Sequence, residues 1–256
     1  MRCVWEHNGE DTLLYSVDAI GAYSRGDSLE AAVRKMKAEA EAYSSWRGQH
    51  PVQEIEIEIV QEKISDLRIA DADSDVLFDA EKVPLTLAEY RELKALVLKS
   101  ASDFYDLYSA VPDKEESCLA HRRTFYGAVP RTAQEMYEHT KNVNAYYFGE
   151  ISIDVDNEGT IWDCRKRGFE RLEQTQGFLE NKVVEGSYGE LGREERQFRK
   201  TIFSQFSSVS CQFHEGKGHM FCSLLHPQSP LQWLYRMGLL EMPISPSSFQ
   251  LFIENL

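Results

Sequence analysis

The chain has 256 residues, enough for one large domain or two small ones, each with a hydrophobic core. Its content of 42% hydrophobic and 11% aromatic residues is ordinary for a globular protein and argues against extensive disorder. The formal net charge of −14 argues against nucleic-acid binding, because that binding depends on Lys and Arg side chains that neutralise phosphates. The negative net charge does not exclude a basic protein as a partner.

No segment approaches the roughly 20 apolar residues that a membrane-spanning helix needs. Residues 1–7 lack the apolar run of a signal peptide. The five cysteines are scattered and include no C-x-x-C pair. We therefore expect a cytoplasmic protein with reduced thiols and no membrane association. Cys211 and Cys222 have the chemistry of metal ligands, but buried structural cysteines are the favoured interpretation.

Residues 1–64 predict a small α+β domain. It opens with strands predicted over 2–7 and 12–17, separated by an Asn-Gly dipeptide that is typical of a tight hairpin turn. A third short strand is predicted over 19–23. Residues 54–59 alternate Glu and Ile, which predicts a last strand with one buried face and one acidic face.

An amphipathic helix is predicted before that last strand. Asp27 and Glu30 have the spacing of a capping box, so Asp27 is expected to cap the first turn. Gly48 and Pro51 are expected to end the helix. Its apolar stripe at helical spacing consists of Leu29, Ala32, Val33, Met36, Ala40 and Tyr43.

Residues 65–84 are predicted to form a linker. The acidic run over 71–75 resembles the start of a calcium loop, but it lacks the Gly and the closing Glu of that motif. A polar turn is therefore expected there.

Residues 85–210 predict an all-α domain. Its first two helices begin at pairs with capping-box spacing, Thr86 with Glu89 and Thr132 with Glu135. Their apolar stripes consist of Leu87, Tyr90, Leu93, Val97, Ala101, Phe104 and Tyr108, and of Met136, His139, Val143, Tyr146 and Tyr147.

Two further amphipathic helices are predicted over 162–182 and 193–210. Four such helices in succession indicate an antiparallel four-helix bundle, and the long connection over 110–131 suits a crossover link. The segment 211–256 differs, because only five Asp, Glu, Lys or Arg residues lie between Ser204 and Leu256. We expect it to be a divergent tail rich in Pro and Ser.

The N-terminal domain resembles the HicB-like antitoxin family. The resemblance rests on residues 22–32, AYSRGDSLEAA, in which Gly26 allows a tight exit from a strand and Asp27 caps the helix. It implies binding to a small ribonuclease toxin, often together with a DNA-binding segment. No such segment is seen here, so we favour a structural or protein-interaction module. A working antitoxin with a basic ribonuclease partner stays a third, weaker option.

The second domain resembles the DinB/YfiT-like helical bundles. The strongest stretch covers 123–147, RTFYGAVPRTAQEMYEHTKNVNAYY. The resemblance implies a four-helix bundle with a divalent metal held by three histidines, and thiol-transferase or small-molecule hydrolase or isomerase chemistry. One ligand position matches His139, which lies on the predicted stripe with Met136 and Val143. Neutral imidazole suits Zn or Ni, and a hydrogen-bonded core histidine is the equal alternative.

The other two ligands of the family lie on the last helix as an i, i+4 pair, which this chain lacks. The nearest candidates are His214 and His219. A spacing of five residues would turn them about 140° apart on a regular helix, and two glycines between them weaken any helix. A loop could still bring both to one metal. The resemblance therefore implies an incomplete three-histidine site.

This departure coincides with the change in composition. We hypothesise that the native reading frame is lost near residues 204–212, and sequencing the coding DNA tests this. A neighbouring frame that encodes no H-x-x-x-H helix would contradict it. The alternative is a genuinely diverged tail that folds over the bundle.

Two functions from different classes remain. The first is a metal-dependent enzyme of the DinB-like type, acting on a small molecule through a metal-activated water or thiol. The second is a non-catalytic, stress-associated or partner-binding protein that keeps the fold without the site. The sequence specifies neither the substrate nor the oligomeric state.

Overall fold

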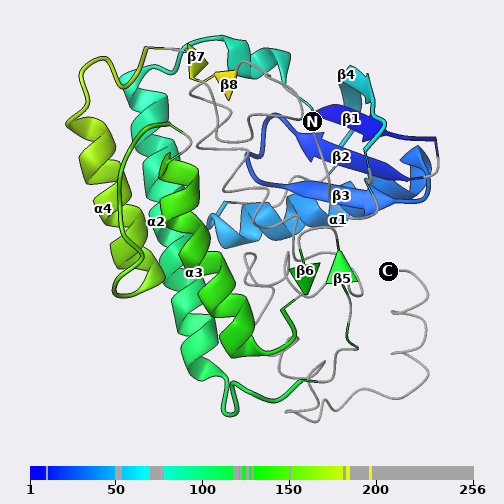
Figure 1. The fold of residues 1–256 in the computed structure, drawn as a ribbon. Helices are drawn as coiled ribbons and strands as arrows, with labels where there is room; N and C mark the ends of the chain where they lie inside the picture. Colours follow the sequence, from blue (N-terminus) through cyan, green and yellow to red (C-terminus); the bar gives the residue numbers. More distant parts are fainter. Residues whose placement is uncertain are drawn as a thin grey trace.

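A computed structural model describes most of residues 1–180 and two pairs beyond them, 183–184 and 196–197 (Figure 1). In this part of the chain, a small N-terminal sheet with one helix precedes three more α-helices. None of these helices has the length and apolar content that a membrane span requires. Within 1–180 the residues outside the description are 10, 50–53, 68, 70–75, 77, 118–120, 122, 125–126, 129 and 150.

The sheet contains β1 (Arg2–His7), β2 (Thr12–Ser16), β3 (Tyr23–Gly26) and β4 (Glu58–Ile64). Its strand order is β3-β2-β1-β4, with β4 parallel to β1 and the other pairs antiparallel. The first predicted hairpin is confirmed, although β2 ends one residue early. Gly9 in its turn has a φ of +90°, a conformation that suits glycine.

Two strands lie away from their predicted positions. Residues 19–22 belong to the turn before β3, in which Ala22 N–H donates to the Ala19 carbonyl at 2.9 Å. The strand predicted over 54–59 begins only at Glu58, whose N–H donates to the Met1 carbonyl at 2.9 Å. Its start is therefore set by the beginning of β1, its parallel partner, and not by the alternation of Glu and Ile.

Helix α1 (Leu29–Trp46) follows β3 directly. Its N-cap is Ser28, whose hydroxyl accepts from the N–H of Ala31 at 3.3 Å, so the predicted Asp27 cap is wrong by one residue. A Cβ atom on Gly26 would lie 2.9 Å from the Ala31 Cβ. Glycine is thus required where β3 meets the first turn of the helix.

Both faces of the sheet are covered. Helix α1 packs on one face, where Cys3 and Leu14 meet Ala32 and Met36. Ile69 and Val76, within the predicted linker 65–84, are buried on the other face. Part of that segment therefore belongs to the core, ahead of the short helix η2 (Asp79–Lys82). The core on that second face contains Val4, Leu13, Tyr15, Tyr23, Ile69 and Val76, with Val17 and Phe78 beside it.

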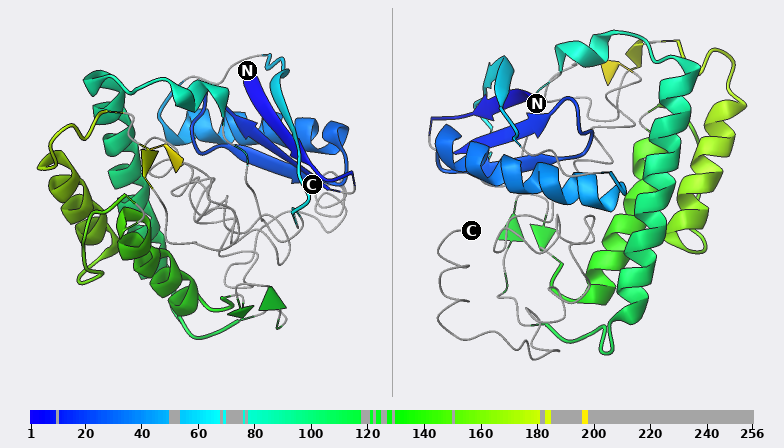
Figure 2. Two further views of the ribbon diagram at one scale, coloured as in Figure 1. Left: turned by 45° about the horizontal axis from the view of Figure 1, so that its top comes forward. Right: turned by 180° about the vertical axis from the view of Figure 1, so that it is seen from behind.

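The remaining helices α2 (Leu87–Ala110), α3 (Ala133–Gly149) and α4 (Ile161–Glu173) pack against one another, and both views in Figure 2 place them side by side. The predicted capping boxes of α2 and α3 are confirmed. Helix α4 ends at Glu173, so the prediction of helix to 182 is wrong. Residues 174–180 form turns, and Gly177 has a φ of +70° there.

The fourth helix predicted over 193–210 lies almost entirely outside the described residues, as does the tail over 211–256. Its two described residues form strand β8 (Arg196–Gln197), paired with β7 (Val183–Val184). The connection before α3 contains a second short hairpin, β5 (Arg123–Thr124) with β6 (Gly127–Ala128).

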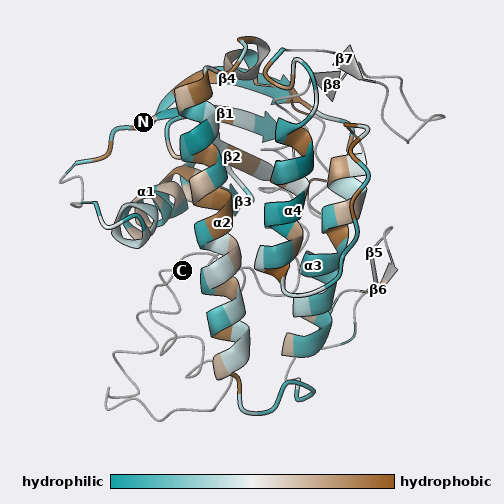
Figure 3. Cartoon of the chain, turned by 90° about the vertical axis from the view of Figure 1, so that its left-hand side faces the viewer, coloured by the Kyte–Doolittle hydropathy of each residue, from teal (hydrophilic) through white to brown (hydrophobic). Residues whose placement is uncertain are grey.

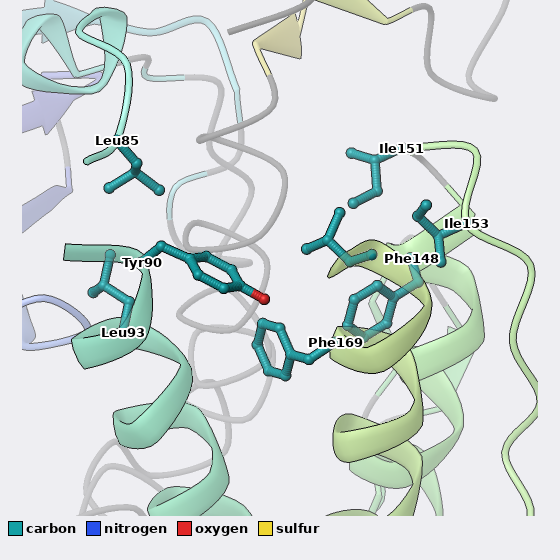
Figure 4. Close-up of a cluster of buried hydrophobic side chains, with 8 residues drawn as sticks. Leu85, Tyr90, Leu93, Phe148, Ile151, Ile153 and Phe169 are labelled. Atoms are coloured by element: carbon teal, nitrogen blue, oxygen red, sulfur yellow. The ribbon is translucent and has the colours of Figure 1, made fainter. Parts of the chain in front are cut away.

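Two apolar clusters hold α2, α3 and α4 together, one towards each end (Figure 4 shows the first). The outward side of α4 seen in Figure 3 is mainly hydrophilic, which is consistent with burial of its other side. The first cluster contains Leu85, Tyr90, Leu93, Phe148, Ile151, Ile153, Phe169 and Leu172. The second contains Ala101, Phe104, Val111, Ala133, Met136, Tyr137 and Ile161.

Candidate functional site

A polar centre lies between these two apolar clusters, in the middle of α3 and α4. It consists of Thr140 and Asn144 from α3 and Arg165 from α4, all of them buried. Along α3 it separates Tyr137 of one cluster from Phe148 of the other. Most of the core beside it is hydrocarbon, so these polar groups need a specific explanation.

Arg165 supplies the charge of the polar centre. Its side chain is 3% exposed, its Nη1 donates to Asn144 Oδ1 at 3.0 Å, and its Nη2 donates to the Thr140 carbonyl at 3.2 Å. Burial lowers the pKa of the guanidinium to about 10, so it remains protonated at neutral pH. A fully buried arginine is rare in proteins.

Thr140 contributes a second feature to the polar centre. Its backbone carbonyl holds Arg165, but its Oγ1 is buried and makes no hydrogen bond to the described part of the chain. A buried hydroxyl left in this state costs about 1–3 kcal/mol. The polar centre thus carries a positive charge on Arg165 and, on the threonine whose carbonyl holds that charge, a buried hydroxyl without a hydrogen bond to the described residues.

The loop before α4 fixes the position of the polar centre. Asn157 Nδ2 donates to the Asn142 carbonyl at 2.8 Å, and its Oδ1 accepts from the N–H of Ala145 at 3.0 Å. A capping box between Thr160 and Asp163 then starts α4. Because Arg165 follows this cap by little more than one turn, the loop and the cap together set where its guanidinium lies.

Cys164 lies beside the polar centre and is fully buried. Its Sγ–H donates to the carbonyl of Glu158 at 3.3 Å. Burial raises the pKa of this thiol above its ordinary value, so the thiolate is disfavoured at neutral pH. We therefore interpret Cys164 as a packing residue and not as a nucleophile.

His139, the predicted metal ligand, is half-buried on α3. At 100° per residue it lies well to one side of the buried face, and Tyr146 from the same predicted stripe is 39% exposed. Met136 and Tyr147 of that stripe are buried. The buried residues of α3 are Ala133, Met136, Tyr137, Thr140, Asn144, Tyr147 and Phe148.

The other two predicted ligands, His214 and His219, lie outside the described residues, as do Cys211 and Cys222. Among the residues with described positions, no group of three His, Cys, Asp or Glu side chains could hold a metal ion. The described residues thus supply one of the three ligands that Zn or Ni would need. They do not by themselves fit a metal centre.

None of the three residues of the polar centre was predicted as a site residue from the sequence. A signal was present for Arg165, which precedes Phe169 by four residues and Leu172 by seven and so shares their helix face. A charged residue is ordinarily assigned to the solvent face. Extending the apolar stripe of α4 towards its cap would have placed Arg165 inside it.

Comparison with known proteins identifies no similar protein. No family model, no curated protein and no solved structure matches the chain. The small sheet, the three packed helices and the polar centre are therefore the features from which a function has to be inferred.

Proposed function

We propose that this chain is a DinB-like protein whose helices bind a small anionic molecule at the polar centre. The proposal takes α2, α3 and α4 as three helices of a four-helix bundle. It is supported by the resemblance over 123–147, which includes all of α3 up to Tyr147. The N-terminal sheet and α1 are then the HicB-like module, joined to the bundle in one chain.

The observation that carries this proposal is a buried cation next to a buried, unused hydroxyl. A guanidinium such as that of Arg165 presents several N–H donors in one plane, which match a carboxylate or a phosphate. The Asn144 side chain and the Thr140 carbonyl each accept a hydrogen bond from Arg165 and so hold the plane of the guanidinium in place. The Thr140 Oγ1 could add a further hydrogen bond to the same anion. Binding sites typically contain groups of this kind, which lower the stability of the protein.

The test compares the wild type with a variant that carries Arg165→Met and Asn144→Leu together. Replacing both hydrogen-bonding partners by apolar groups of similar shape is often neutral or stabilising. We expect inorganic phosphate, acetate or succinate, at constant ionic strength, to raise the unfolding temperature of the wild type but not of this variant. Arg171→Met, an exposed change on the same helix, should keep the response.

Two results would contradict the proposal. One is a wild type that none of the three anions stabilises. The other is an equal response in the wild type and the double variant, which would mean that the anions act elsewhere. A large loss of stability in the double variant, without any anion response in the wild type, would instead make Arg165 a structural link between α3 and α4.

A metal-dependent enzyme of the DinB-like type is the second candidate function. It is favoured by the position of His139, which is half-buried on α3 within the stretch that carries the resemblance. A bound Zn or Ni ion would supply Lewis acidity for thiol-transferase or small-molecule hydrolase or isomerase chemistry. His139, with His214 and His219, would hold it. Of these three, His139 is the residue that lies in the described part of the chain.

Metal analysis of protein purified without a chelating resin tests this second candidate. It predicts one transition-metal ion per chain and its loss in His139→Ala. The exposed His121, changed to Ala, is the matched control and should leave the metal content unchanged. Absence of metal from the wild type would exclude the metal-dependent enzyme and would leave the anion proposal untouched.

For the N-terminal module we propose a role in protein interaction. Both faces of its sheet are covered, but β4 is an edge strand on which Val60 is 45% and Ile64 is 72% exposed. Exposed apolar residues on a sheet edge favour contact with another chain. Val60→Lys should abolish co-purification of a specific partner that the wild type retains, whereas Lys37→Glu on the exposed side of α1 should not.

A further inference from the structure

The C-terminal end of α1 contacts the middle of α2, and Figure 2 shows this end of α1 reaching that helix. Trp46 Nε1 donates to Asp103 Oδ2 at 2.6 Å. Lys99 Nζ donates to the same carboxylate oxygen at 2.6 Å and lies 5.0 Å from the Trp46 ring centroid. An indole, an ammonium group and a carboxylate thus form a closed set of three contacts across the two helices.

A second ionic contact lies on the next residue of the chain. Arg47 Nη2 pairs with Glu92 Oε1 at 2.7 Å, and the Arg47 guanidinium lies 5.9 Å from the ring centroid of Tyr43. An exposed ion pair of this kind contributes little alone, about 0–1 kcal/mol. Together with the Trp46 contact, however, it fixes the end of α1 on α2 at two points, more than one turn apart along α2.

Apolar burial accompanies these polar contacts. Tyr43 and Trp46 are only 5% and 8% exposed, and they form a cluster with Ala19 and Ala22 of the module. Leu96 of α2 packs against that cluster. The first half of α1 packs on the sheet, whereas the aromatic rings of its last turns lie among Ala19 and Ala22 of the module, with Leu96 of α2 packed against them.

We infer that the N-terminal module and the helices α2, α3 and α4 form one cooperative folding unit, fastened through Trp46, Lys99 and Asp103. This contrasts with two domains that move independently on a linker. The contact joins residues 57 positions apart, and its aromatic component is shielded from solvent. One consequence is that the end of α1 is occupied by its own chain, so a protein partner of the module must bind elsewhere.

The test follows the unfolding of both parts of the full chain in guanidinium chloride. Hydrogen exchange at the end of α1 and in α2 reports on each part separately. We expect both parts to unfold with the same midpoint. Asp103→Ala, a change in α2 alone, should then raise exchange at the end of α1 about tenfold or more. Asp106→Ala, at an exposed position on α2, should leave it unchanged.

A double-mutant cycle with Trp46→Phe and Asp103→Ala isolates the contact itself. Phe keeps an aromatic ring, smaller than the indole, and removes the N–H donor. We expect the two changes to be non-additive. The change in the unfolding equilibrium constant of the double variant should differ about threefold or more from the product of the changes in the two single variants. Different midpoints for the two parts of the wild type would overturn the inference, and so would additivity in the cycle. If a variant fails to fold, the unfolding midpoints of the two parts of the wild type decide whether they form one cooperative unit.

Discussion

Phe148 of α3 packs directly on Gly168 in the middle of α4. A Cβ atom on Gly168 would lie 2.1 Å from Cε2 of Phe148, closer than atoms in contact can come. The ring of Phe148 also meets that of Phe169 edge-on at 5.6 Å, and Figure 4 shows both rings in the same cluster. A glycine inside a helix destabilises it by roughly 1 kcal/mol relative to alanine. Here it allows α3 and α4 to approach each other.

Gly168→Ala should therefore destabilise the protein, although alanine is the better helix former. Overpacking of a filled core costs about 1–3 kcal/mol, and the gain in helix propensity offsets only part of that. Urea unfolding measures the difference. Gly149→Ala is the control, because a Cβ atom there would meet nothing within 4 Å. Equal stability of Gly168→Ala and the wild type would show that Phe148 can move aside at little cost.

Thr140→Val should stabilise the protein. The change removes a buried Oγ1 that makes no hydrogen bond to any described residue and keeps the branched shape of the side chain. Removal of a buried hydroxyl that lacks a hydrogen bond should raise the free energy of unfolding by about 1 kcal/mol. Thr160→Val provides a control of opposite sign, because it removes the N-cap of α4 and should cost about 1 kcal/mol. A loss of stability in Thr140→Val would mean that this hydroxyl has a partner in solution.

Asp163 makes the stability of α4 depend on acidity. Its carboxylate accepts from the Thr160 hydroxyl at 2.7 Å and from the Thr160 N–H at 3.0 Å, and these hydrogen bonds lower its pKa below the ordinary value of 3.8. The folded pKa is thus below the unfolded one. The stabilisation is therefore present above the unfolded pKa and is lost as the pH falls through the folded pKa.

Asp163→Ala should accordingly be less stable than the wild type at neutral pH, and the difference should shrink below pH 3.8. Urea unfolding over a series of acidic pH values measures it. Asp154→Ala, an exposed change in the preceding loop, should give a curve parallel to the wild type. A difference between the wild type and Asp163→Ala that persists unchanged into acid would contradict the role of the carboxylate.

Local signals in the sequence predicted local structure. The capping boxes at Thr86 and Thr132 involve residues three apart, so their spacing alone predicted where α2 and α3 begin. The position of β4 depends on the Met1 carbonyl, which lies 57 residues earlier in the chain and which no local pattern reveals. The end of α4 depends on turns around Gly177, which interrupt an apolar spacing that would otherwise continue.

The candidate site was harder to predict, for a physical reason. His139 was the predicted site residue, because histidine binds metals and the residue lies on the predicted apolar stripe. The buried face of α3 instead includes Thr140 and Asn144, which accept hydrogen bonds from the buried Arg165 of α4. A buried polar cluster is missed in this way because each polar residue, taken alone, is assigned to the surface, and only the spacing of Arg165 from Phe169 and Leu172 pointed inwards.

Cys3 should make the protein sensitive to alkali. Its thiol is fully buried between the sheet and α1, and burial raises its pKa from 9.0 to about 11. Because the folded pKa exceeds the unfolded one, the stabilisation is complete below pH 9 and is lost as the pH rises towards 11. Wild-type stability should thus fall more steeply over this interval than that of Cys3→Ala. Tyrosine and lysine titration affect both proteins alike, so the difference between their urea-unfolding curves reports on Cys3. Parallel curves would show that the thiol titrates normally.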